Sequence, residues 1–193
     1  MYKTTDEWDA HYQKIEAMVA DIDEIDAVIG QFLDFARGAD EQKSEQDLDA
    51  VAAEVAEHYR RINRKVSLAP GEVKPFRFAR LAVRRAITNL VDNALRYAGE
   101  PIEIKVFNSN HHAAVEVLDR GPGIPAAETE RLKRPFTRLD AARSGPGGAG
   151  LGLALVERIA PAPRGRLELL PREGGGLRAR LSLHTGLPTD APA

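Results

Sequence analysis

The stretch ARLAVRRAITNLVDNALRYA, residues 79–98, decides the fold because its two helical faces differ. One is an apolar stripe that predicts packing against a sheet. It consists of Val83, Ile87, Leu90, Val91, Ala94 and Leu95. The other is polar, at i, i+4, i+7 and i+8: Asn89, Asn93, Arg96 and Tyr97. Asparagine is a mediocre helix former, so the pair needs a reason. Amide oxygens can hold Mg²⁺ beside a triphosphate without adding charge, although two solvated asparagines are the simpler alternative.

Segments on both sides of this helix predict a mixed sheet covered by helices. A helical pattern runs from Leu48 to Ile62 behind Asp47, a candidate N-cap, and another ends near Ala160. The predicted strands are KVSLA (65–69), KPFRF (74–78), PIEIKVFN (101–108), AAVEVLD (113–119), RLELLP (166–171) and LRARLSL (177–183). This order predicts a two-layer α/β sandwich.

An apolar heptad seam precedes these segments and predicts a long coiled-coil-type helix. Its spacings alternate between three and four: Ile15, Met18, Ile22, Ile25, Ile29 and Phe32, widened by Val19, Val28, Leu33 and Phe35. Packing in a helical bundle explains the seam, and an amphipathic helix lying on its own domain is the alternative. The polar stretch 37–47 contains a glycine and predicts a linker.

Composition excludes several classes of protein. A net charge of −2 over 193 residues is unlike a strongly basic nucleic-acid binder. The absence of cysteine removes disulfides, thiolate chemistry and cysteine-bound zinc. No apolar run approaches the roughly 20 residues that cross a bilayer, and the start lacks the apolar core of a signal peptide, so we expect a soluble chain.

Three further motifs carry possible chemistry. In DRGPGIP (119–125) a carboxylate at a strand end can accept a hydrogen bond from an exocyclic amine, although the motif can also be a plain turn. RPFTRLDAAR (134–143) offers Arg138 and Arg143 to a polyphosphate, or two solvated surface charges. GGAGLGLALVERIA (147–160) leads from glycines into a helix, which suits phosphate binding as well as a simple turn.

These four motifs, in this order, resemble the catalytic domain of sensor histidine kinases, and most of all the EnvZ-like osmosensor kinases. That domain belongs to the ATP-binding group that includes gyrase, Hsp90 and MutL. NLVDNALRYA resembles the N box, DRGPGIP the first glycine box, RPFTR the F box and GGAGLGLALV the second glycine box. The resemblance covers about residues 45–184. Upstream, IDEIDAVIGQFLDFARG (22–38) resembles the second helix of the dimerisation hairpin. The whole resemblance implies four parts: a partial dimerisation and phosphotransfer region over 1–38, a linker over 39–47, a catalytic ATP-binding domain over 48–184 and a flexible tail over 185–193.

The resemblance also implies residue roles toward ATP and Mg²⁺. Asn93 matches the family's metal ligand, with Asn89 in support, and Arg96 and Tyr97 match residues along the phosphates and nucleoside. Asp119 matches the carboxylate that reads the adenine amino group. The matches beside the base are Gly121, Gly123 and Ile124. Phe136 matches a residue of the family's mobile lid, and Arg138 and Arg143 match lid cations that reach the γ-phosphate. The second glycine box matches Gly148, Gly150, Leu151, Gly152 and Leu153, and Ala149 departs from the serine or threonine of many relatives.

The same helix separates a kinase from an ATPase. ATPases of this group, as the resemblance implies, carry a water-activating glutamate where this chain has Asn89, which cannot take a proton. We therefore expect slow or absent hydrolysis, and transfer of the γ-phosphoryl group to a histidine. The family's H box is absent, and His11 lacks its context, so we expect the acceptor helix to be missing and no autophosphorylation. An ATPase switch and a non-catalytic nucleotide- or partner-binding module are the alternatives.

Partners follow from the same resemblance. It implies a homodimer through residues 15–35 and a cognate response regulator that receives the phosphoryl group, while the net charge of −2 indicates no nucleic-acid partner. It places the chain in the cytoplasm as part of a bacterial inner-membrane protein, attached to the membrane only through N-terminal segments missing here.

Overall fold

The computed structural model describes residues 11–16, 18–19, 22, 29–30, 33, 41–109, 111–139, 149–160 and 165–186. Several predicted residues therefore lie outside the described ones. They are Ile25, Val28, Phe32 and Phe35 of the seam, Arg143 and Gly148 of the candidate site, and residues 187–193 of the tail.

A five-stranded mixed sheet forms one layer, in the order β2-β4-β5-β7-β6. Its strands are β2 (Val66–Ala69), β4 (Ile102–Ser109), β5 (His112–Leu118), β7 (Leu177–His184) and β6 (Gly165–Pro171). β2 runs parallel to β4, and the other neighbours are antiparallel. The predicted hairpin and the closing pair of strands are both confirmed.

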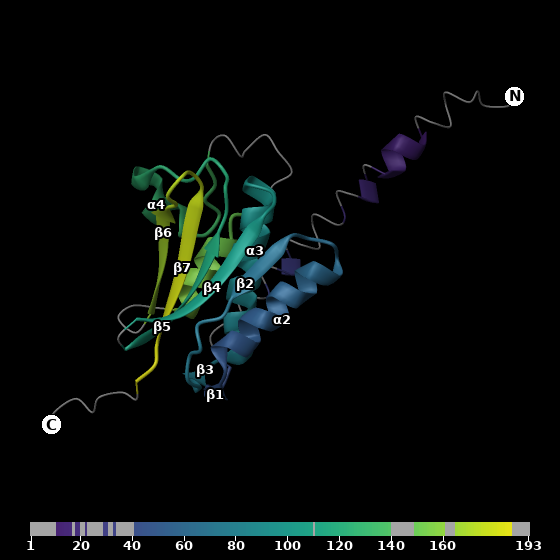
Figure 1. Cartoon of the computed structure of the whole chain (residues 1–193). Helices are drawn as coiled ribbons and strands as arrows, with labels where there is room; N and C mark the ends of the chain where they lie inside the picture. The colour runs from purple at the N-terminus through teal and green to yellow at the C-terminus, as the bar shows by residue number, and fades with distance from the viewer. Residues whose placement is uncertain are drawn as a thin grey trace, which may run out of the picture.

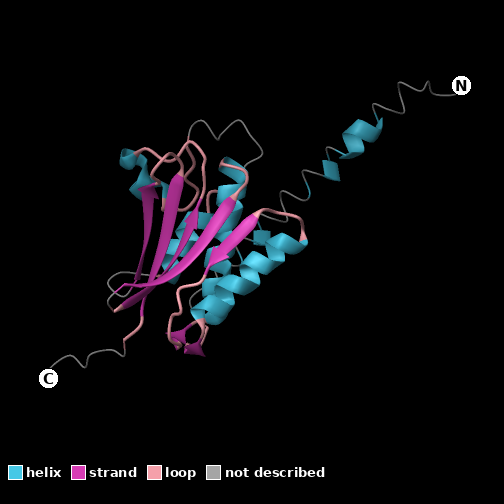
Figure 2. Ribbon diagram, in the orientation of Figure 1, coloured by secondary structure: helices cyan, strands magenta, loops and turns pink. Residues whose placement is uncertain are grey.

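Helices form the second layer on one face of the sheet (Figures 1 and 2). They are α2 (Leu48–Arg61), α3 (Arg80–Tyr97) and α5 (Gly152–Ile159). Apolar side chains of α2, α3 and α5 share one buried cluster with alternate residues of the strands, which confirms the two-layer α/β sandwich. A short turn, η1 (Ala126–Glu128), and α4 (Thr129–Leu132) were not predicted, because neither carries a readable apolar period.

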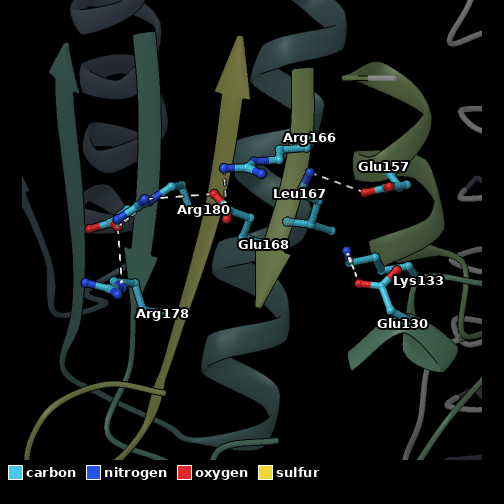
Figure 3. A network of polar contacts seen from close by, with 9 residues as sticks. Glu130, Lys133, Glu157, Arg166, Leu167, Glu168, Arg178 and Arg180 are labelled. Carbon is cyan, nitrogen blue, oxygen red and sulfur yellow. Dashed lines mark hydrogen bonds and ion pairs between the residues drawn. The ribbon is translucent and has the colours of Figure 1, made fainter. Parts of the chain in front are cut away.

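In the described part of the chain, the other face of the sheet carries paired charges and no helical layer (Figure 3). Glu116 is buried, and its Oε1 lies 2.7 Å from Arg180 Nη2 and 3.5 Å from Arg178 Nε. Arg180 Nη1 also lies 3.8 Å from Glu168 Oε2. The guanidinium carbon of Arg180, Cζ, lies 5.3 Å from the centroid of the Phe107 ring. Pairing compensates the cost of burying these charges. The alternate positions of the same strands point to the opposite face and form the core.

The predicted linker is corrected where it meets the sandwich. Strand β1 (Ser44–Gln46) pairs antiparallel with β3 (Phe76–Phe78) in a separate two-stranded sheet. Just before it, the Glu41 carboxylate accepts hydrogen bonds from the backbone N–H groups of Leu81 and Ala82, both at 2.9 Å. α3 has no side-chain acceptor at its own N-cap, so a distant carboxylate satisfies these amides.

The N-terminal segment is helical at each residue that the structure describes between positions 11 and 33. Its described seam residues are largely exposed: Ile15 at 55%, Met18 at 63% and Ile22 at 56%. An apolar stripe left in water is typical of a surface awaiting a partner. Within the described part of the chain, no helix combines the length and apolar character needed to span a membrane.

Tyr59 joins α2 to α3 and supports a pH prediction. It is buried, and its hydroxyl donates to Asp92 Oδ1 at 2.5 Å. Burial, then the hydrogen bond and the charge of Asp92, raise the pKa of the phenol. The unfolded value is about 10. The contribution of Tyr59 to stability is therefore complete below about pH 10 and is lost as the pH rises beyond it.

We expect Tyr59→Phe to lower the free energy of unfolding by about 2 kcal/mol at neutral pH. The difference should shrink above about pH 10, where the parent loses its advantage. Urea unfolding at neutral and alkaline pH measures both effects, with the exposed Tyr97→Phe as control. An equal difference between Tyr59→Phe and the parent at both pH values would show that Tyr59 does not set this dependence.

Candidate functional site

A cavity of about 450 Å³ opens between α3, the end of β5, the start of β7 and the loops that precede α5. Its lining comes from segments far apart in the sequence. It comprises Leu90, Asn93, Ala94, Arg96, Tyr97, Ala98, Val117, Asp119, Pro122, Gly123, Ile124, Leu132, Thr137, Arg138, Leu139, Gly150, Gly152, Leu153, Leu177 and Ala179. Most of these are apolar, with a few polar groups among them, as in sites for small organic ligands.

Asp119 is the buried carboxylate of this cavity, with 6% of the residue exposed. Its Oδ1 accepts hydrogen bonds from the backbone N–H of Gly121 at 2.8 Å and of Leu177 at 3.0 Å. No group among the described residues donates to Oδ2. One oxygen therefore fixes the orientation of the carboxylate, and the other is available to a donor on a ligand.

Two glycines keep the backbone next to Asp119 close to other segments. A Cβ at Gly121 would lie 2.6 Å from Ala98 Cβ. Gly123 has a φ of +73°, and a Cβ there would lie 3.2 Å from Gly176 O. The first glycine is required by close contact with the end of α3 and the second by its positive φ. Of the two, Gly123 lines the cavity, and Gly121 packs behind it against α3.

The two asparagines of α3 meet the first residue of α5. Asn89 Nδ2 donates to Arg85 O at 2.9 Å, which orients the amide. A Cβ at Gly152 would lie 3.1 Å from Asn89 Oδ1 and 3.4 Å from Asn93 Nδ2. The amides and the N-terminal end of α5 thus occupy one corner of the site. The partial positive charge at that helix end favours anions.

The loop around Phe136, between α4 and α5, approaches the same corner. This residue is 69% exposed and has a φ of +60°, and its N–H donates to Gly150 O at 3.0 Å. Gly150 has a φ of +71°, and a Cβ there would lie 2.9 Å from both Thr137 N and Thr137 O. Gly150 is therefore the point at which the second glycine-rich segment packs against Phe136 and Thr137.

Gly150→Ala tests this contact against a matched glycine. Gly99 has a φ of +75° and open space around its Cβ position, so Gly99→Ala introduces backbone strain of about 1–2 kcal/mol alone. Gly150→Ala adds a collision with the backbone of Thr137. We expect it to lower the free energy of unfolding by roughly 3 kcal/mol, measured by urea denaturation. Equal losses in the two variants would contradict a packed lid contact.

The structure brings most of the predicted site residues to one cavity. Those that line it are Asn93, Arg96, Tyr97, Asp119, Gly123, Ile124, Arg138, Gly150, Gly152 and Leu153. Asn89, Gly121 and Phe136 contact lining residues without lining the cavity themselves, and Leu151 is buried. Sequence reasoning missed the apolar floor, Val117, Leu177 and Ala179, because its residues look like ordinary core positions.

The fold and the site define a nucleotide-binding α/β sandwich. The chain belongs to the family of histidine kinase-, DNA gyrase B- and HSP90-like ATPases, whose model matches residues 79–187. It is 33% identical over 175 residues to the sensor protein RstB of Escherichia coli, covering 86% of this chain and 40% of RstB. It is 41% identical over 105 residues to the sensor protein CutS of Streptomyces coelicolor, covering 52% of this chain and 25% of CutS.

A solved structure supports the same classification. The histidine kinase domain of the E. coli osmosensor EnvZ is 33% identical and superposes with a TM-score of 0.59, over 81% of this chain and 97% of that domain. The resemblance inferred from the four motifs is confirmed. The sandwich is an ATP-binding catalytic domain of the sensor histidine kinase type. The chain spans less than half the length of the relatives RstB and CutS.

Proposed function

We propose that this chain binds ATP with Mg²⁺ and transfers the γ-phosphoryl group to a histidine on a dimerisation helix, for onward transfer to an aspartate of a response regulator. The observation that carries the proposal is Asp119, whose Oδ1 is held by two backbone amides while Oδ2 is left for a ligand. A carboxylate fixed in this way accepts from the 6-amino group of adenine. The backbone at Gly123, which lines the cavity, then lies beside the ring, with Gly121 next to it.

The phosphates extend from the base toward the asparagines and α5. Mg²⁺ usually keeps several waters and takes one or two protein oxygens together with substrate phosphates. The amide oxygens of Asn93 and Asn89 suit it, and the bound ion would neutralise charge on the phosphates. Arg96, Arg138 and Arg143 would contribute positive charge along the chain of phosphates, and the N–H groups near Gly148, Gly150 and Gly152 would donate to them.

The reaction needs positioning and charge neutralisation more than acid or base groups. A histidine ring nitrogen attacks the γ-phosphorus, the bond from phosphorus to the bridging oxygen breaks, and ADP leaves with the electron pair. Asn89 argues against the ATPase alternative, because its amide donates to the Arg85 carbonyl and has no basic site for water. We infer that hydrolysis is slow.

The exposed seam supports a homodimer through residues 15–35. Ile29 and Leu33 remain 50% and 44% exposed, like the seam residues before them. Sensor histidine kinases act as membrane-anchored dimers, so we infer that this domain works in the cytoplasm beside a second copy. His11 lies on the same segment, and we expect it to remain unphosphorylated.

The fate of labelled γ-phosphate tests the proposal. The chain is incubated with Mg·ATP labelled at the γ-position, alone and with a separately produced histidine-phosphotransfer hairpin of a sensor kinase. We expect little label to be released as inorganic phosphate from the chain alone, and acid-labile, alkali-stable label on the hairpin when it is present. Steady release of phosphate without the hairpin would favour the ATPase alternative, and label on His11 would contradict the expectation that His11 is not an acceptor.

A further inference from the structure

The β6–β7 turn, residues 172–176, and Leu177, the first residue of β7, lie beside Asp119 at the end of the neighbouring strand β5. Leu177 N donates to Asp119 Oδ1 at 3.0 Å, and Asp119 N donates to Leu177 O at 3.0 Å. Gly176 packs so closely that a Cβ there would lie 2.1 Å from Asp119 O. The turn therefore contacts both the backbone and the carboxylate of this residue.

Arg172 anchors this arrangement at the base of the turn. Its Nη1 donates to Asp119 O at 3.3 Å, and its Nη2 donates to Glu103 Oε2 on β4 at 2.9 Å. The Arg172 side chain is 16% exposed and the Glu103 side chain 31%. Arg172 does not line the cavity, so any influence on a ligand passes through Asp119. A planar guanidinium with two fixed acceptors holds their relative position more rigidly than a single donor would.

The orientation of the Asp119 carboxylate matters for base recognition because hydrogen bonds weaken steeply with angle. A 6-amino purine donates to Oδ2, whereas a 6-oxo purine presents an oxygen that repels it. Discrimination between the two is therefore greatest when the carboxylate cannot turn or withdraw. We propose that Arg172 is a positioning residue for base specificity: with Glu103 it fixes Asp119 so that the site accepts adenine and rejects 6-oxo purines.

This inference rests on the proposed function, in which Asp119 reads the base. A purely structural role for Arg172 predicts a different result, because a loosened hairpin would weaken all nucleotides alike. The ratio of the dissociation constants for ITP and ATP separates the two roles. ITP has the same ribose and triphosphate as ATP and carries a 6-oxo group, so the ratio reports on the base contact alone.

Calorimetric titrations with Mg·ATP and Mg·ITP on four variants and the parent test the proposal. The parent should prefer ATP, and Asp119→Asn should abolish the preference. Arg172→Gln should lower the ITP to ATP ratio roughly fivefold, the equivalent of one hydrogen bond, mainly through weaker ATP binding. Arg172→Lys should retain part of the preference. Arg166→Gln is the control, because Arg166 lies on β6 with an ion pair to Glu168 and no contact with Asp119.

The outcomes separate the two proposals. If the parent does not prefer ATP, or Asp119→Asn leaves the preference intact, the proposed reading of the base is wrong. If the parent prefers ATP, Asp119→Asn loses this preference, and Arg172→Gln keeps the parent's ratio, only the role of Arg172 is overturned, whatever its effect on stability. Should Arg172→Gln fail to fold, Glu103→Ala removes the acceptor that anchors the same guanidinium, and an unchanged ratio there overturns the inference equally.

Discussion

Replacing Asp119 by asparagine should raise the dissociation constant for Mg·ATP about a hundredfold. The reason is that the base loses the hydrogen bond from its amino group to the carboxylate, and a buried polar group is left without a partner. Asparagine has nearly the same shape, and its oxygen can keep the backbone hydrogen bonds from Gly121 and Leu177. Its NH₂ group then stands where Oδ2 was. Two donors, the amide of the variant and the amino group of adenine, face each other, so binding is lost while the fold remains.

Glu116→Gln is the matched control for this change. It is also an acid-to-amide substitution at a buried position of β5, but Glu116 pairs with Arg178 and Arg180 on the face of the sheet opposite α2, α3 and α5. It should lower stability and leave ATP affinity within a few-fold of the parent. Calorimetry on both variants, with circular dichroism to confirm folding, makes the comparison. Equal losses of affinity would mean that Asp119 acts only through the stability of the sheet.

Asn93→Ala should remove most of the Mg²⁺-dependent part of ATP binding, an effect of about a hundredfold. Asn93 lines the cavity, and its amide lies against Gly152 at the start of α5. Alanine is a better helix former than asparagine, so α3 should remain intact. The loss should therefore appear in affinity and not in thermal stability. Titrations with ATP in the presence of Mg²⁺ and of EDTA measure it.

Asn89→Ala provides the comparison on the same helix face. Asn89 does not line the cavity, and its Nδ2 is engaged by the Arg85 carbonyl. We expect a loss several-fold smaller than that of Asn93→Ala. If both variants match the parent's ATP affinity with Mg²⁺ and also with EDTA, the asparagines do not hold the metal.

Much of the fold could be predicted because its signals are local. The stripe from Val83 to Leu95 and the alternation in β4 and β5 need only neighbouring residues to be read. Strand β1 could not, since three polar residues form it only by pairing with β3, about thirty positions away. The contact of Glu41 with α3 is equally non-local, and no motif announces it.

The site was predictable where side chains carry the chemistry. Asn93 and Asp119 were chosen by residue type and position, Gly152 was implied by the resemblance to the family, and all three line one cavity. Leu177 was missed because its backbone N–H, which any residue except proline supplies, makes the contact. Val117 and Ala179 were missed because an apolar cavity floor and an apolar core have the same periodicity.

Titration of the parent protein with Mg·ATP, with Mg·ITP alongside, tests the central claim most directly. A nucleotide-binding catalytic domain should bind one ATP per chain, saturably, and bind ITP much more weakly. Absence of ATP binding by folded protein would contradict the proposed function, and the family's fold would then serve a partner-binding module in this chain.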